Sequence, residues 1–117
     1  MATREEILEA LADYQHQCNS NERLRRIQRD WSRRLHFHAR DTDDWFTMVV
    51  VKGEITEFGP GVTGEPEVVV HGSSEDLCDM FWGDLNPSQK YLRGEILVQA
   101  APEDVMRLDA ITAIIWP

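Results

Sequence analysis

The sequence predicts a single domain of the α+β class, because a block of β-strand patterns is followed by a block of mainly helical patterns. Alternating apolar and polar residues begin near residue 34 and recur in short runs up to residue 70. Helical periods precede this block, and they dominate the chain after it. Strands grouped in this way pair mainly antiparallel and carry their helices on one face. The chain has 117 residues and no shift in composition, so we expect one domain over residues 1–117.

Two helices are expected before the first strand. Thr3 and Glu6 have the spacing of a capping box, and the helix that they open should end near residue 17. A polar cluster then interrupts the pattern. Leu24, Ile27 and Trp31 follow at intervals that place them on one side of a second helix, which is rich in arginine.

The strand patterns also predict which side chains face the core. Leu35 and Phe37 alternate with His36 and His38, as in a half-buried strand whose histidines face solvent or a partner. The next run is apolar on both faces and suits an interior strand. The expected strands are residues 34–40, 45–51, 55–58, 68–70 and 95–99, the first four forming an antiparallel meander.

Cap residues define three helices in the second half of the chain. Ser73 or Ser74 caps a helix that ends at a glycine. Asn86 is expected as the cap of a short helix with Pro87 at its first position. Pro102 then opens the terminal helix.

The charge distribution argues against several classes of protein. A formal net charge of −9 disfavours a nucleic-acid partner, because phosphates would meet a repulsive field. No apolar run approaches the roughly 20 residues of a membrane span, and the acidic N-terminus is unlike a signal peptide, so a cytoplasmic location is expected. Residues 23–40 carry seven basic groups and one acid. We expect this segment to pair with acids of the same molecule or of a second copy; contact with RNA, an anionic membrane or a partner protein is the alternative.

The chain carries no residue pattern that predicts catalysis or a bound cofactor. Cys18 and Cys78 have no CxxC or Cys/His spacing and are expected to be buried thiols. His36 and His38 could share a metal from one strand face, but no third ligand has a fitting position, so a structural role is expected. Phosphate loops, nucleophile elbows and HExxH motifs do not occur. We therefore expect a protein that is not an enzyme and needs no cofactor.

The C-terminal half resembles the sterol carrier protein type 2 (SCP2) sterol-binding family. The stretch GEPEVVVHGSSEDLCDMFWGDLNPSQKYLRGEILVQ holds a strand, a serine cap, a helix with a leucine-rich face, and then a strand after a glycine. Upstream, WFTMVVVKGEIT is similar to the family's central strand and the turn after it. The likeness covers about residues 33–117. Its distinguishing positions are Gly83, Leu85, Asn86, Pro87, Tyr91 and Gly94.

This resemblance implies a five-stranded, mostly antiparallel sheet with helices on one face and an apolar cavity between them. The implied function is non-enzymatic binding, with or without transfer, of a lipid such as a sterol, fatty acid or acyl-CoA. The alternative is an interaction or dimerisation module that serves an associated enzyme, with a filled cavity. Membrane contact would be at most transient, and a homodimer or a lipid-metabolising enzyme stays open as a partner.

The expected ligand-binding residues are apolar side chains of the interior strand and of the later helices. An apolar stripe on a helix ordinarily packs a dry core, so only the resemblance favours a cavity here. Methionines suit such a wall because they adapt to irregular shapes, and Met106→Arg is expected to lower ligand uptake. The ten expected residues are Phe46, Met48, Leu77, Met80, Phe81, Trp82, Tyr91, Met106, Leu108 and Ile111.

Overall fold

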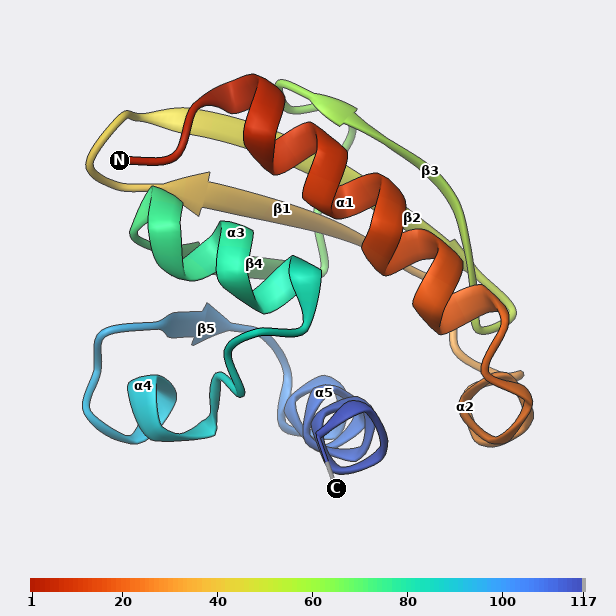
Figure 1. Ribbon diagram of the computed structural model, residues 1–117. Coiled ribbons are helices and arrows are strands. Elements are labelled where there is room, and N and C mark those ends of the chain that lie inside the picture. Colours follow the sequence, from red (N-terminus) through yellow and green to blue (C-terminus); the bar gives the residue numbers. More distant parts are fainter. Residues whose placement is uncertain (117) are drawn as a thin grey trace.

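The computed structural model of the protein describes residues 1–116 and forms a five-stranded sheet with its helices gathered on one face (Figure 1). This arrangement confirms the predicted α+β class. Within the described residues, no helix is long and apolar enough to cross a membrane. In chain order the elements are α1 (Arg4–Asn19), α2 (Glu22–Ile27), β1 (Arg33–Ala39), β2 (Asp44–Val51), β3 (Glu54–Pro60), β4 (Val68–Gly72), α3 (Ser74–Trp82), α4 (Ser88–Leu92), β5 (Leu97–Gln99) and α5 (Pro102–Ile115).

The sheet has the strand order β3-β2-β1-β4-β5, and its pairs are antiparallel except for the parallel pair of β1 and β4. A mostly antiparallel sheet was predicted correctly, but the meander of the first four strands was not. After β3 the chain crosses the outer face of the sheet and enters β4 beside β1. The crossing loop is held to β1, since Glu67 donates its backbone N–H to the carbonyl of Arg34 at 3.0 Å.

Helices α1 and α3 cover the inner face of the sheet. The capping box at the start of α1 is present: the Thr3 hydroxyl accepts from the Glu6 backbone, and Glu6 accepts in return. In α3 the Ser73 side chain caps the first turn, and Gly83 ends the helix with a φ of 87°, a conformation that glycine adopts at little cost. Both helices therefore begin or end where the sequence predicts.

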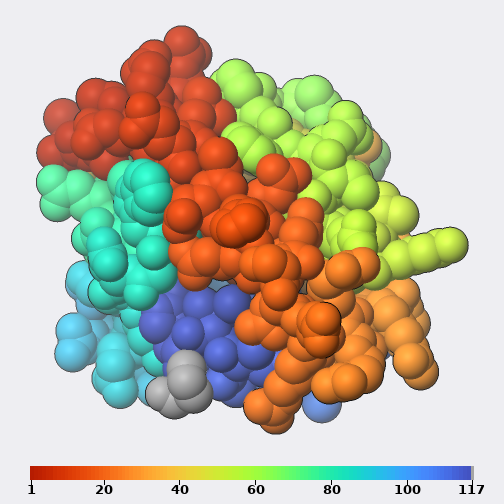
Figure 2. Space-filling view, turned by 45° about the vertical axis from the view of Figure 1, so that its right-hand side comes forward, coloured from red at the N-terminus to blue at the C-terminus, as the bar shows by residue number. Residues whose placement is uncertain are grey.

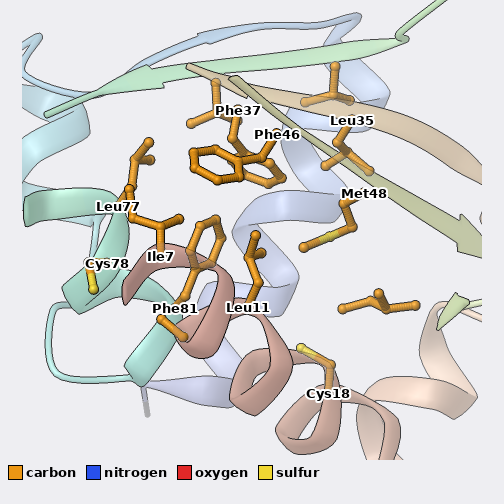
Figure 3. Packing of buried hydrophobic residues seen from close by; sticks show 14 of the residues in the cluster. Ile7, Leu11, Cys18, Leu35, Phe37, Phe46, Met48, Leu77, Cys78 and Phe81 are labelled. Atoms are coloured by element: carbon orange, nitrogen blue, oxygen red, sulfur yellow. The ribbon is translucent and has the colours of Figure 1, made fainter. Parts of the chain in front are cut away.

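The core lies between these two helices and the inward side chains of the strands (Figure 3). Phe46 and Phe81 are completely buried, and the Phe37 ring meets Phe81 edge to face with centroids 5.0 Å apart. Ile7 and Leu11 of α1 close the layer from the helix side. Burial of each of these side chains contributes about 1.5–3 kcal/mol, so this layer is the main source of stability.

Three predicted boundaries were wrong, each because a local hydrogen bond closes a turn. Trp31 does not lie on the second helix, because α2 ends at Ile27 and the Trp31 N–H bonds to the carbonyl of Gln28. The cap of α4 is Pro87, while the Asn86 side chain accepts from the Ser88 backbone.

The last strand is also shorter than predicted. The N–H groups of Glu95 and Ile96 both donate to the carbonyl of Lys90, at 2.9 and 3.2 Å. They close the turn after α4 and cannot join the ladder with β4, so β5 begins at Leu97.

His36 was expected to face solvent, but it is 6% exposed. The loop between β3 and β4 covers it, and its Nε2 lies 3.0 Å from the carbonyl oxygen of Thr63. Cys18 and Cys78 are free, buried thiols, as predicted. The basic segment pairs in part with acids of the same chain, as the ion pairs of Arg25 with Glu54 and of Arg33 with Asp104 show.

The hairpin between β2 and β3 closes against the segment after α2. Gly53 has a φ of 79° and donates its N–H to the carbonyl of Trp31 at 2.9 Å. A Cβ at this position would lie 2.7 Å from the carbonyl oxygen of Gln28, so only glycine fits the contact. The turn of the hairpin and the Gln28 backbone are thus packed directly together.

A candidate ligand cavity under the last helix

A cavity of about 150 Å³ lies between the inner face of the sheet and the surrounding helices. Inward side chains of the strands form its base. The alternation of each strand places these residues on the same face as the core, and the cavity continues from that core toward α5. The strand residues at the cavity are Leu35, Phe37, Met48, Val50, Ile55, Val70 and Val98.

The remaining wall comes from all five helices and from the segment after α2. Tyr14 and Cys18 of α1 contribute on one side, and Met80 and Phe81 of α3 on another. Helix α5 closes the cavity and lies at the surface between the α1–α2 segment and α3 (Figure 2). The further helical and loop residues at the cavity include Leu24, Trp31, Tyr91, Leu108, Ile111 and Trp116.

The titratable groups of the α1 wall are held in their neutral forms. Burial raises the pKa of the Cys18 thiol from 9.0 to about 12, and burial raises the pKa of Tyr14 well above its ordinary value. Both side chains are uncharged at neutral pH. An occupant of this region therefore meets apolar surface and neutral dipoles, which suits a hydrocarbon chain.

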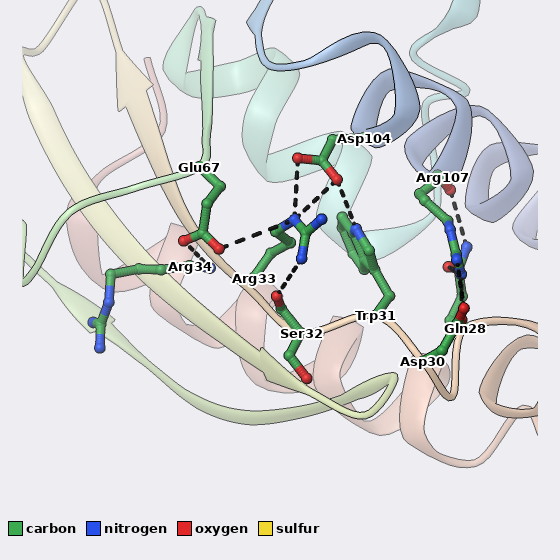
Figure 4. A network of polar contacts seen from close by, with 9 residues as sticks. All are labelled: Gln28, Asp30, Trp31, Ser32, Arg33, Arg34, Glu67, Asp104 and Arg107. Carbon is green, nitrogen blue, oxygen red and sulfur yellow. Dashed lines mark hydrogen bonds and ion pairs between the residues drawn. The ribbon is translucent and has the colours of Figure 1, made fainter.

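Helix α5 packs only partly buried apolar side chains against the core, among them Leu108 and Ile111, and it is also attached by polar contacts. Within Pro102–Ile115 the only buried residue is Asp104. Its carboxylate accepts from the indole N–H of Trp31 at 2.9 Å and from the Arg33 guanidinium at 2.9 and 3.1 Å (Figure 4). These charge-assisted bonds hold the first turn of α5 to the start of β1.

A second set of polar contacts lies one turn further along α5. Arg107 donates through two nitrogens to the Asp30 carboxylate at 2.8 and 2.9 Å, and the guanidinium lowers the pKa of Asp30 (Figure 4). The buried side chain of Gln28 donates to the carbonyl of Arg107 at 3.0 Å. The far end of the helix has one neutral bond, from the indole N–H of Trp116 to the carbonyl of Gly83 at 3.0 Å. Helix α5 is therefore held more firmly at its first half than at its end.

The structure brings six of the ten expected ligand-binding residues to the cavity, and these are Met48, Met80, Phe81, Tyr91, Leu108 and Ile111. Phe46 and Leu77 lie instead in the packed core with no exposed surface. Trp82 is 40% exposed and Met106 is 73% exposed, and neither is part of the cavity wall. Met106 points outward because it lies on the solvent side of α5, so Met106→Arg is no longer expected to lower ligand uptake.

The wall formed by α1 and by the segment after α2, including Tyr14, Cys18 and Trp31, was not predicted from the sequence. Tyr14 and Cys18 continue the apolar face of α1 at a spacing of four residues, which was a usable signal. Trp31 gave no such signal, because its position depends on the turn after α2 and on its bond to Asp104.

The described cavity is smaller than a typical ligand site. Sites for drug-sized ligands span about 300–1,000 Å³, whereas a cavity of about 150 Å³ accommodates a molecule the size of benzene. A longer ligand needs additional space. Rotation of the flexible side chains of Met48 and Met80, or displacement of α5, can provide it.

The fold and the cavity define the class of protein: an α+β domain whose sheet and helices line a mainly apolar cavity. No protein-family model matches the sequence, and no curated protein sequence is significantly similar to it. Comparison with solved structures gives a consistent result. A crystal structure of sterol carrier protein 2 aligns with a TM-score of 0.68 and 15% identity over 97% of this chain and 92% of that chain.

Two further solved structures extend the comparison. A UbiJ-SCP2 ubiquinone synthesis protein aligns with a TM-score of 0.70 at 11% identity, covering 93% of this chain and 94% of that chain. The solution structure of palmitated SCP2L2 from Aedes aegypti aligns with a TM-score of 0.66 at 15% identity, over 99% and 96% of the two chains. At these identities the likeness establishes the fold. The protein thus has the SCP2 fold, which confirms the resemblance found in its sequence.

Proposed function

We propose that this protein binds one slender apolar ligand, of the size and chemistry of a fatty acyl chain, in the cavity under α5 without transforming it. The observation that carries the proposal is the cavity itself, which is lined mainly by apolar side chains from the sheet and from all five helices, with Gln28 and Asp109 also in its wall. The neutral Tyr14 and Cys18 support an uncharged occupant at the α1 wall. The palmitated state named for the Aedes aegypti protein supports an acyl chain as the ligand class.

The expected affinity follows from the area that a ligand can bury. An acyl chain that loses about 400 Å² of apolar surface gains about 10 kcal/mol, and association costs at least about 4 kcal/mol. The difference of about 6 kcal/mol corresponds to a dissociation constant of about 40 μM. Displacement of α5 lowers the affinity further. The structure therefore favours a carrier that releases its ligand readily over a protein that retains it. We infer that such exchange takes place in the cytoplasm.

The proposal is tested by titrating the protein with a fluorescent fatty acid and displacing the probe with palmitate. Leu108→Arg places a charge in the cavity wall and is expected to abolish saturable binding. Met106→Arg is the matched control, since it puts the same side chain on the exposed face of the same helix. Binding should be retained in this control.

Two outcomes would count against the proposal. One is a folded wild-type protein that shows no saturable binding of the probe. The other is equal binding by the Leu108 and Met106 variants when their circular dichroism spectra match that of the wild type. Native mass spectrometry of the protein as purified adds an independent measurement, in which a stoichiometric lipid is the expected result.

A further inference from the structure

Two histidines meet on the outer face of the sheet, opposite the helices and the cavity. His38 in β1 and His71 in β4 are direct partners in the parallel register. Neighbouring strands lie about 4.8 Å apart, so the backbone itself brings the two rings together. The Nδ1 atoms of the two imidazoles are 2.9 Å apart. The pair stands on two interior strands of the sheet, which form a rigid support.

The other nitrogen of each ring faces an oxygen acceptor. Nε2 of His38 lies 2.7 Å from the carboxylate of Asp43, and Nε2 of His71 lies 3.2 Å from the side-chain oxygen of Gln99. An ionised carboxylate only accepts hydrogen bonds, so Nε2 of His38 carries its hydrogen. With the Gln99 amide oxygen facing the ring, as in this structure, the hydrogen of His71 also lies on Nε2. Trp45 stacks on the His38 ring, with centroids 4.2 Å apart, and fixes its plane.

This arrangement leaves two Nδ1 lone pairs directed at each other. When both rings are neutral and both Nε2 atoms are protonated, neither Nδ1 has a hydrogen to donate. Two acceptors at 2.9 Å repel unless a proton or a metal ion lies between them. Neutral imidazole is a preferred ligand of zinc, copper and nickel, and histidines that bind metals almost always donate their second N–H to a carboxylate, a carbonyl or water.

We propose that His38 and His71 bind a divalent transition-metal ion through their Nδ1 atoms. Two metal–nitrogen bonds of about 2.0–2.1 Å in tetrahedral geometry place the nitrogens about 3.3 Å apart, so the rings need to separate by a few tenths of an ångström and to turn until both lone pairs point at the ion. Asp43 and Gln99 orient the two rings. Within residues 1–116 no group of three or more His, Cys, Asp or Glu side chains is arranged to hold a metal. Water or an external ligand therefore completes the coordination.

The pair of histidines differs from the one that the sequence suggested. His36 lies on the same strand face as His38, but its ring is buried and its Nε2 faces the Thr63 carbonyl at 3.0 Å. The partner of His38 comes from a neighbouring strand 33 residues away in the chain. Only the strand order reveals it.

The proposal is tested by isothermal titration of the full chain with copper, nickel or zinc chloride in a buffer that does not chelate metals. One ion per chain is expected to bind, with copper binding more tightly than nickel or zinc. His71→Gln should abolish this site. His16→Gln removes an exposed histidine of α1 and should leave it intact. Copper should also quench the fluorescence of Trp45, and Trp45→Phe should remove that quenching while binding remains.

A second variant keeps the test decisive if His71→Gln disturbs the fold. Asp43→Asn removes only the carboxylate beside Nε2 of His38 and is expected to weaken binding about 10–100-fold. Asparagine tolerates the φ of 56° at this position, so the backbone should be unchanged. Two results would overturn the proposal: no metal binding at millimolar concentration, or equal binding by the wild type and both variants. A proton shared between the rings in nitrogen-detected spectra, with no effect of added metal, would have the same meaning.

Discussion

Helices α1 and α3 are held to the sheet by more complete apolar burial than helix α5. Helices α1 and α3 bury apolar side chains such as Ile7, Leu11 and Phe81 completely, whereas α5 buries only the polar residue Asp104. Apolar burial sums over many contacts, and water cannot replace it. The polar contacts of α5 can be exchanged for bonds to water at a small net cost. This difference supports the proposal that α5, and not the layer of α1 and α3, moves to admit a ligand.

The largest expected effect lies in the layer of α1 and α3. Phe81→Ala removes a completely buried ring that meets both Phe37 and Tyr14, and it should lower the free energy of unfolding by about 3–5 kcal/mol. Urea denaturation measures the change. Met106→Ala in α5 is the comparison and should shift stability by less than about 0.5 kcal/mol. Equal losses in the two variants would mean that the helices do not differ as described.

A smaller effect is expected where α5 begins. Asp104→Asn retains an acceptor for the Trp31 indole but leaves the Arg33 guanidinium without its buried carboxylate. The Arg33 side chain is 30% exposed, so water compensates in part and the loss should be about 1–3 kcal/mol. Uptake of a fluorescent fatty acid, followed by stopped flow, should become faster. Slower uptake would show that α5 must be ordered before the ligand can bind.

The end of α5 should affect exchange more than stability. Trp116→Phe removes one neutral hydrogen bond, to the Gly83 carbonyl, and should cost about 0.5–1.5 kcal/mol. We expect faster labelling of Cys18, which lines the cavity, and unchanged labelling of Cys78 on α3. Labelling is followed in variants that retain one cysteine each. A parallel increase at both thiols would indicate global unfolding rather than movement of α5.

The smallest effect is a pH dependence within the cavity wall. The folded pKa of Cys18 is raised from 9.0 to about 12, so the folded state retains its proton more strongly than the unfolded state. The stabilisation linked to this proton is complete below pH 9.0 and is lost as the pH rises toward about 12. Cys18→Ala should therefore flatten the alkaline side of the stability curve. An unchanged alkaline slope would contradict the burial of this thiol.

Local signals in the sequence were sufficient for much of the fold. The capping box at Thr3, the glycine at the end of α3 and the alternation around Phe37 each depend on residues that are close in the chain. The parallel pairing of β4 with β1 could not be predicted from such local signals. It depends on a loop that crosses the sheet, and no short-range pattern specifies that path.

The candidate site was predictable only in part for the same reason. Met80 and Leu108 were identified because apolar helical residues near a recognised motif commonly face a cavity. Met106 shares that chemistry and was wrongly included, because two residues along a helix correspond to a turn of about 200°. Trp31 was missed as a wall residue because its placement depends on Asp104, which lies 73 positions away.

The close approach of Gly53 to Gln28 links the β2–β3 hairpin to helix α5. Without this contact, a ligand would affect the hairpin and the helix separately. The Gln28 backbone supports the hairpin turn, while its side chain bonds to the backbone of α5. A ligand that pushes α5 outward therefore pulls on the residue against which the hairpin rests. Amide hydrogen exchange at Gly53, whose N–H bonds to Trp31, should change with occupancy although the turn is exposed to solvent on its other side. Occupancy of the interior would then be detectable at the rim of the sheet.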